Sequence, residues 1–309
     1  MLKHSGRVLL CTALAVLTAC GSHRPTVPSA AAASRPESAQ TSAPVAAAQF
    51  TQSADGVSIA WHRYGQGETA VVLIHGWATD SSIWHAQLAA LAAHYSVVTL
   101  DLAGQGASGA NREAWTLAHF AQDVAAVVAQ LPSAHLVLVG DGLGGPVALE
   151  AAPLIGTRLT GIIGVETFRT IGLNPPLPST LNHELQPFRA DFAGAVRQFL
   201  SSTLFHAQAD PALVRFVAEL MVQTPPDRAV AVLTELNKLD YATILPAVKV
   251  PIVVIDSDLG GAVDAARLQH TAARLRVVSL VGDDSFAMLD DVQRFNATLL
   301  QALAALVAQ

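Results

Sequence analysis

The stretch LVLVGDGLGG, residues 136–145, decides the fold of this chain. Its first four residues form an apolar run, as in a strand that is buried on both faces of a sheet. Glycines follow at 140, 142, 144 and 145, and helical spacing of apolar residues runs from Leu143 through Ala151. A buried strand that passes into a helix through a glycine-rich turn predicts a parallel sheet with helices on both faces.

Strands and helices alternate on both sides of this stretch. The first two strands read as a hairpin, and the later ones read as buried strands separated by helices. Strands are expected at 49–53, 57–64, 70–74, 97–100, 136–139, 161–165, 252–255 and 277–280, and helices at 83–93, 117–131, 143–151 and 292–307.

A long insert separates the strand that ends at Val165 from the strand that begins near Val250. Apolar residues recur at helical spacing in residues 195–200, 212–221 and 229–236. The insert therefore predicts a helical cap over about residues 168–247, at the sheet edge where open parallel sheets bind ligands.

The N-terminus has the pattern of a secretory signal. Lys3 and Arg7 precede an apolar run at 8–17, which is too short to span a bilayer as a helix. The following LTACG, residues 17–21, resembles the lipobox of bacterial lipoproteins. The resemblance implies a signal peptide at 1–19 and a lipid on Cys20, which would hold the protein at a membrane.

The residues after Cys20 refine this expectation. Residues 20–48 are rich in Ala, Ser, Pro and Thr and predict a flexible tether to a folded domain at 49–309. Neither Gly21 nor Ser22 is the aspartate that tends to retain lipoproteins in the inner membrane. The resemblance therefore implies a periplasm-facing protein of the cell envelope, anchored in the outer membrane.

Composition excludes several classes of function. The formal net charge of -6 gives no reason to expect a nucleic-acid partner. The only cysteines are Cys11 and Cys20, so the folded domain has neither a disulfide nor a thiolate-bound metal. No cofactor and no metal site is predicted.

Four motifs in chain order resemble the α/β-hydrolase superfamily from about Gln49 to the C-terminus. They are VLIHGW at 72–77, DLAGQGAS at 101–108, the glycine turn at 140–144 and FAMLDD at 286–291. The resemblance implies an α/β-hydrolase fold, a mostly parallel twisted sheet with a helical cap insert. It also implies an oxyanion-type pocket from His75, Gly76, Trp77 and Leu143.

The resemblance places the catalytic nucleophile of the family at a residue that has no side chain. In the G-x-S-x-G turn the flanking glycines are Gly140 and Gly144, so the nucleophile position is Gly142. Shifting the motif by one residue would make Asp141 the nucleophile. It would then put Val139 and Leu143 at the two flanking positions, which require small residues. Gly142 also fits the positive φ of this turn without strain.

The base and the acid of the family's triad are also in question. The histidine position corresponds to Ser285, and serine cannot accept a proton near neutral pH as imidazole does. The acid position corresponds to Gly260, with Asp258 close by, and Glu166 occupies an alternative acid position. One acid of the triad, Glu166 or Asp258, is thus retained. It has no histidine base that it could orient.

Carboxylates gather at the expected edge of the sheet. Asp256, Asp258, Asp283 and Asp284 follow two strands that should be neighbours. Such a cluster can bind a divalent cation or a basic ligand. Ordinary solvated loop charge is the simpler interpretation.

Three functional hypotheses follow. The first is a membrane-anchored, non-catalytic α/β-hydrolase-like protein that binds a small apolar ligand or an envelope protein under its cap. The second is an active hydrolase of esters or related bonds that uses non-standard residues. The third is a tethered structural protein without a ligand.

Overall fold

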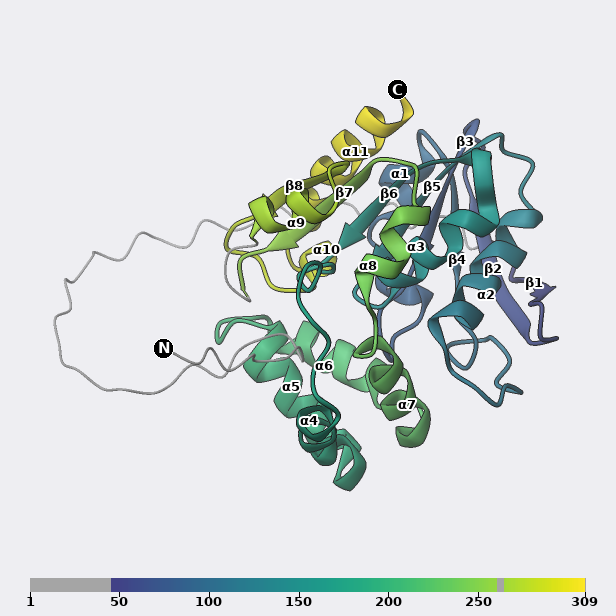
Figure 1. The fold of residues 1–309 in the computed structure, drawn as a ribbon. Coiled ribbons are helices and arrows are strands. Elements are labelled where there is room, and N and C mark those ends of the chain that lie inside the picture. Colours follow the sequence, from purple (N-terminus) through teal and green to yellow (C-terminus); the bar gives the residue numbers. More distant parts are fainter. Residues whose placement is uncertain (1–45, 260–263, 309) are drawn as a thin grey trace, which may run out of the picture.

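The computed structural model describes residues 46–259 and 264–308, and its centre is a twisted eight-stranded sheet (Figure 1). The strand order is β1-β2-β4-β3-β5-β6-β7-β8. β2 pairs antiparallel with β1 and β4, and all other pairs are parallel. The strands are β1 Gln49–Gln52, β2 Ser58–Tyr64, β3 Thr69–Ile74, β4 Ser96–Leu100, β5 His135–Asp141, β6 Leu159–Val165, β7 Ile252–Ser257 and β8 Leu275–Leu280.

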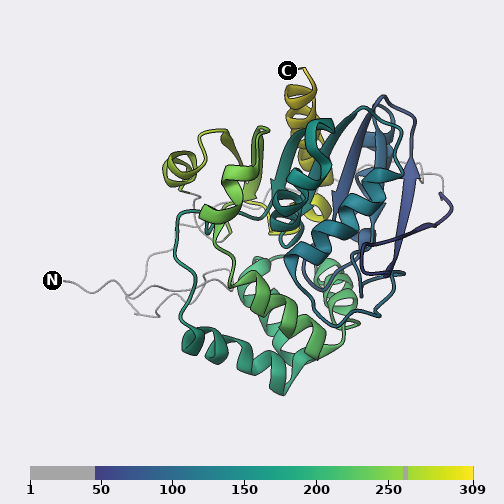
Figure 2. The same ribbon diagram turned by 45° about the vertical axis from the view of Figure 1, so that its right-hand side comes forward.

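Helices cover both faces of the sheet, which confirms the predicted fold class (Figures 1 and 2). On one face α2, Leu117–Ala129, contacts α3, Gly144–Ile155. On the other, α11, Val292–Val307, contacts α1, Leu88–Ala92, as well as the central strands. α9, Ala265–Thr271, joins β7 to β8, and α10, Ala287–Asp290, precedes α11.

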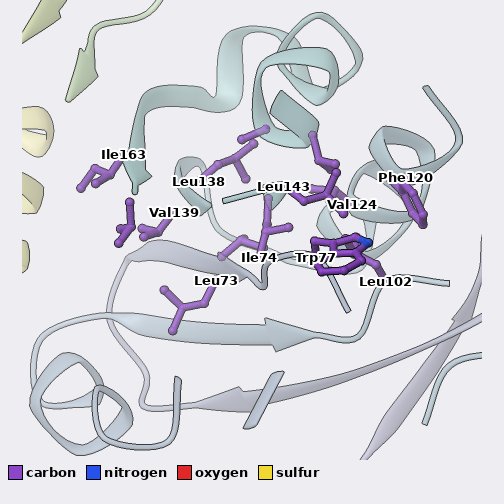
Figure 3. Packing of buried hydrophobic residues seen from close by; sticks show 14 of the residues in the cluster. Leu73, Ile74, Trp77, Leu102, Phe120, Val124, Leu138, Val139, Leu143 and Ile163 are labelled. Atoms are coloured by element: carbon purple, nitrogen blue, oxygen red, sulfur yellow. The ribbon is translucent and has the colours of Figure 1, made fainter. Parts of the chain in front are cut away.

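The core explains why the central strands carry continuous apolar runs. All residues of β3 are buried, and all of β5 except its first are buried. Figure 3 shows Ile74 of β3 and Leu138 of β5 on the side of the sheet where Phe120 and Val124 of α2 lie, and Leu73 pointing to the opposite side. Burying one such side chain fully contributes about 1.5–3 kcal/mol. This core fixes the strand ends that form the site.

The insert between β6 and β7 is helical, as its spacing predicts. In Figure 1 its main helices gather in a group apart from the sheet. They are α4 Pro178–Ala190, α5 Phe192–Phe199, α6 Pro211–Met221 and α7 Pro226–Leu236, with the short segments η3 Leu200–Leu204, α8 Tyr241–Ile244 and η4 Leu245–Ala247.

Two elements differ from expectation. The helix expected at 83–93 is a 3-10 turn, η1 Ser81–Trp84, followed by the short α1. Asp80 accepts the Ser82 amide and caps the 3-10 turn, and the buried Gln87, the residue before α1, donates from its side chain to the carbonyl of Met288. Helix α4 was not expected, because it is largely polar.

Several predictions fall on residues outside the described ranges. These are the signal peptide at 1–19, Cys20, the tether as far as residue 45, and Gly260. Within 46–259 and 264–308, no helix combines the length and the apolar character needed to cross a membrane.

Candidate functional site

A cavity of about 440 Å³ lies between the carboxyl ends of the central strands and the cap. The sheet side contributes residues that follow β3, β5, β6 and β8, and the cap side contributes apolar side chains of α5, α6 and α7. Its lining includes Gly76, Trp77, Asp141, Gly142, Leu143, Pro146, Glu166, Phe199, Leu204, Met221, Leu233, Leu236 and Ser285. The structure thus brings Gly142, Ser285, Gly76, Trp77 and Leu143 to one cavity, whereas His75, which was expected in the pocket, does not line it.

Gly142 forms the sharp turn between β5 and α3. Its φ is 45°, and its amide donates to the Val165 carbonyl at 2.9 Å. A Cβ on Gly140 would lie 2.2 Å from the Gly144 backbone, and one on Gly144 would lie 2.4 Å from the Ile74 carbonyl oxygen. Packing therefore requires both flanking glycines.

The space above Gly142 itself is open. A Cβ at this residue would meet nothing closer than the Gly76 Cα, at 3.9 Å. A side chain would therefore fit, although the positive φ would cost it about 1–3 kcal/mol. The residue with positive φ is Gly142, whereas Asp141 is the last residue of β5 with no such φ, which argues against Asp141 as the turn residue. The turn has the shape of a nucleophile elbow and holds no nucleophilic atom.

Two backbone amides close to this turn in the cavity lining have no acceptor among the described residues. The amides of Trp77 and Leu143 donate no hydrogen bond to any described residue. Leu143 immediately precedes α3, so the helix dipole adds partial positive charge at its amide. The pair can bind a carbonyl oxygen, as in an oxyanion hole.

The side chain of His75 links this turn to the loop after β4 by two hydrogen bonds. The His75 ring is fully buried, and its Nε2 accepts the Leu102 amide at 2.9 Å. The other ring nitrogen, Nδ1, therefore carries the proton and donates to the Gly76 carbonyl at 2.9 Å. Burial lowers the pKa of His75 below its usual value, so the ring is neutral and structural.

The neighbouring turn at 101–108 is also structural. Asp101 accepts the amides of Ser81 and Ala107, at 2.9 and 2.8 Å. Ser108 donates its hydroxyl to the Asp101 carbonyl at 2.6 Å. These bonds hold the loop after β4 in place beside the cap.

Ser285 lies where the cap meets the loop after β8. Its amide donates to the Leu204 carbonyl at 3.0 Å, and the next residue, Phe286, stacks on Phe205 with ring centroids 5.5 Å apart. Among the described residues that line the cavity there is no histidine and no cysteine. The described lining therefore supplies neither an imidazole base nor a thiol.

Glu166, one of the two candidate acids, is held by other groups. One of its carboxyl oxygens accepts the Ser257 amide, and the other lies 3.4 Å from Arg169. Arg169 also pairs with the buried Asp256 at 2.8 Å. Burial and the neighbouring Asp256 raise the pKa of Glu166 well above its usual value, which favours a proton shared between the two carboxyls.

The carboxylates of the predicted acidic cluster each have a separate partner. Asp256 pairs with Arg169, and Asp258 accepts the Gly282 amide at 2.7 Å. Asp283 pairs with Arg294 at 3.2 Å, and Asp284 accepts the His206 amide. In the part of the chain that the structure describes, no group of three or more His, Cys, Asp or Glu is arranged to hold a metal ion. The four carboxylates stabilise loops.

Asp141, which the sequence places at this edge of the sheet, differs from the other carboxylates of the site. It is 5% exposed and lines the cavity, and its carboxyl group has no hydrogen bond or ion pair with any described residue. Burial raises the pKa of Asp141 to about 7. The sequence gives its place directly before the turn glycine but not that its carboxyl group is left without a partner.

Trp77 connects the cavity to the cap. Its indole Nε1 donates to the Ala229 carbonyl of α7 at 2.9 Å, and its ring meets Phe188, Phe192 and Phe199 edge-on. Trp84, the other tryptophan near this loop, does not line the cavity and is fully buried beside Phe295.

We expect Trp77→Phe to lower the free energy of unfolding by at least about 1 kcal/mol, because the Ala229 carbonyl loses its donor and the smaller ring loses part of its packing against the cap. Urea unfolding followed by circular dichroism measures this. Equal midpoints and slopes for the two proteins would show that the bond between core and cap contributes nothing.

Comparisons with known proteins agree with this geometry. The sequence family described as "alpha/beta hydrolase fold" matches residues 69–212. A pimeloyl-[acyl-carrier protein] methyl ester esterase of Edwardsiella ictaluri is 30% identical over 190 residues, which cover 60% of this chain and 72% of that protein. The same-named esterase of Aeromonas hydrophila is 32% identical over 149 residues, covering 48% of this chain and 57% of its own.

Solved structures show the same fold. A bromoperoxidase from Bacillus anthracis has a TM-score of 0.74 at 19% identity, covering 84% of this chain and 100% of its own. An esterase from Exiguobacterium antarcticum has a TM-score of 0.73 at 20% identity, covering 83% and 99%. With the strand order, the glycine turn and the cap, these matches establish that the chain belongs to the α/β-hydrolase fold superfamily.

Proposed function

We propose that this protein binds a small, mainly apolar acyl ligand in the cavity under its cap and does not hydrolyse it by the serine mechanism of the fold. The observation that carries the proposal is Gly142, a residue with the φ and the open space of a nucleophile elbow but no attacking atom. Ser285, at the expected base position, has no imidazole to offer.

The cavity supports binding in two ways. Its walls include Phe199, Leu204, Met221, Leu233 and Leu236, which suit an apolar chain. The free amides of Trp77 and Leu143 can hold a carbonyl oxygen at one end. An acyl group presents both features.

We also propose that the protein is anchored to a membrane of the cell envelope through lipidated Cys20. The support is the sequence alone, namely the short apolar run and the LTACG motif at 17–21. Metabolic labelling with an alkyne-tagged fatty acid tests it, with Cys20→Ala as the control that should lose the label.

A second candidate function is ester hydrolysis by non-standard residues. The esterase names of the sequence relatives favour it, as does Asp141, a buried carboxyl with its pKa raised to about 7. In that case Asp141 would remove a proton from an attacking water while the Trp77 and Leu143 amides hold the carbonyl oxygen.

A paired binding and turnover assay distinguishes the candidates. We expect N-phenyl-1-naphthylamine, an apolar fluorophore, to brighten in the cavity and p-nitrophenyl octanoate to displace it without release of p-nitrophenolate above the uncatalysed rate. Leu236→Trp, which takes up part of the cavity, should weaken binding. Leu154→Trp makes the same exchange on the exposed face of α3 and should not.

Two outcomes would change the assignment. Saturable release of p-nitrophenolate that Asp141→Asn abolishes would establish the second candidate. Failure of both the fluorophore and the ester to bind the natural chain would refute an acyl-binding cavity.

A further inference from the structure

The cavity contains an acceptor that the protein leaves without a donor. Asp141 is 5% exposed and lines the cavity, yet no described residue donates a hydrogen bond or pairs a charge with its carboxyl group. Buried polar groups in folded proteins almost always have a partner, because desolvation is otherwise uncompensated. A ligand that fills the cavity can supply the missing donor.

The carboxyl group of Asp141 lies against Gly76, the residue before Trp77. A Cβ on Gly76 would be 2.4 Å from the Asp141 Oδ2. A Cβ on Gly142 would have the Gly76 Cα as its nearest neighbour, at 3.9 Å. Trp77, whose amide has no acceptor, is the next residue after Gly76. Donors for a carbonyl oxygen and an acceptor for a proton therefore adjoin the same small space.

Charge at the cavity does not favour an anionic ligand. Besides Asp141, the charged residues among its described lining are Glu166 and Arg169. Arg169 is engaged by Glu166, Asp256 and the Ser257 carbonyl. A carboxylate ligand would thus meet Asp141 without a cation reserved for it, whereas a neutral ligand avoids this repulsion.

We propose that the cavity selects carboxamides with an apolar acyl chain over the corresponding esters. The amide carbonyl accepts from the Trp77 and Leu143 amides, and the adjacent amide N–H donates to the carboxylate of Asp141. An ester has the same carbonyl but no N–H, so it leaves Asp141 buried and unpaired. The inference rests on the proposed acyl-binding function and names its ligand class.

The test compares N-methyloctanamide with methyl octanoate, which share an acyl chain and differ at one atom of the linkage. Displacement of N-phenyl-1-naphthylamine from the purified natural chain at pH 8 gives both dissociation constants. We expect the amide to bind about 10- to 100-fold more tightly, as for other buried acceptors left unpaired by a ligand.

Variants locate the preference at Asp141. Asp141→Leu removes the acceptor at similar size and should leave amide and ester within about threefold of each other. Asp141→Asn offers both a carbonyl and an N–H, so it should also bind amide and ester with similar affinity. This variant keeps the test decisive if the leucine variant does not fold. Asp227→Asn, an exposed carboxyl on α7, is the matched control and should keep the full preference.

The outcomes separate this inference from the function on which it rests. Equal binding of amide and ester to the natural chain would overturn the amide selectivity and leave acyl binding intact. A preference that persists in both Asp141 variants would overturn the assignment to Asp141. If neither ligand displaces the fluorophore, acyl binding fails and the selectivity fails with it.

Discussion

Replacing Asp141 by asparagine is expected to stabilise the ligand-free protein at pH 8.5 by up to about 4 kcal/mol relative to its effect at pH 4. The reason is that burial raises the pKa of Asp141 from 3.8 to about 7, with no hydrogen-bond donor to offset the cost of its charge. In the unfolded chain this carboxyl ionises at its ordinary pKa.

The direction of the change in the free energy of unfolding with pH follows from the protons bound by the folded and unfolded chains. Between about pH 4 and pH 7 the folded protein holds a proton on Asp141 that the unfolded chain has released. The contribution of Asp141 to the free energy of unfolding therefore falls as pH rises through this window and is constant above it. Asparagine does not titrate and removes this fall.

Urea unfolding of both proteins from pH 4 to pH 8.5 gives the measurement. The difference between the two proteins isolates Asp141, because Glu166, Asp256, Asp283 and Asp284, whose pKa values are also raised, are present in both. Parallel profiles would contradict a buried, unpartnered carboxyl. Asp227→Asn, which removes an exposed carboxyl, should show no such divergence.

The double substitution Gly142→Ser with Ser285→His is expected to create ester hydrolysis. Serine at 142 has open space above it, and both positions line the same cavity. General-base assistance contributes about 10²–10⁴-fold, so the double variant should hydrolyse p-nitrophenyl octanoate at least about 100-fold faster than either single variant. The two groups act as a unit, so each alone should give little.

A carboxylate to orient the new imidazole is not in place. Glu166 is held by Ser257 and Arg169, and Asp258 by the Gly282 amide. Loss of the acid costs less than loss of the nucleophile or base, so activity should be visible but incomplete. A double variant that folds, as shown by its circular dichroism, and is no faster than Ser285→His alone would contradict the assigned positions.

The fold was predictable because its signals are local. β3 and β5 are buried on both faces and therefore read as continuous apolar runs, and α11 begins and ends at the expected residues, Val292 and Val307. The turn glycines at 140 and 144 were equally legible, since close backbone contacts exclude every larger residue there.

Helix α4 was missed because its apolar stripe is narrow. Only Leu181, Leu185 and Phe188 are buried, and Pro187 lies inside the helix. The helical spacing of those three residues and Pro178 at the helix start are the sequence signals of this helix.

The partners of the site residues could not be predicted, because they come from distant parts of the chain. Glu166 is bound by Ser257, and Ser285 contacts Leu204 of the cap. The same holds for Asp141, whose importance lies in having no partner among the described residues. A sequence gives the residue types at a sheet edge and not which of them are left unpaired after packing.

The most direct test of the central claim, that the elbow holds no nucleophile, is the intact mass of the natural chain after exposure to a fluorophosphonate that labels activated serines. The account predicts no adduct on the natural chain and one adduct on the variant carrying Gly142→Ser and Ser285→His. A stoichiometric adduct on the natural chain would contradict the account and identify the protein as a working serine hydrolase.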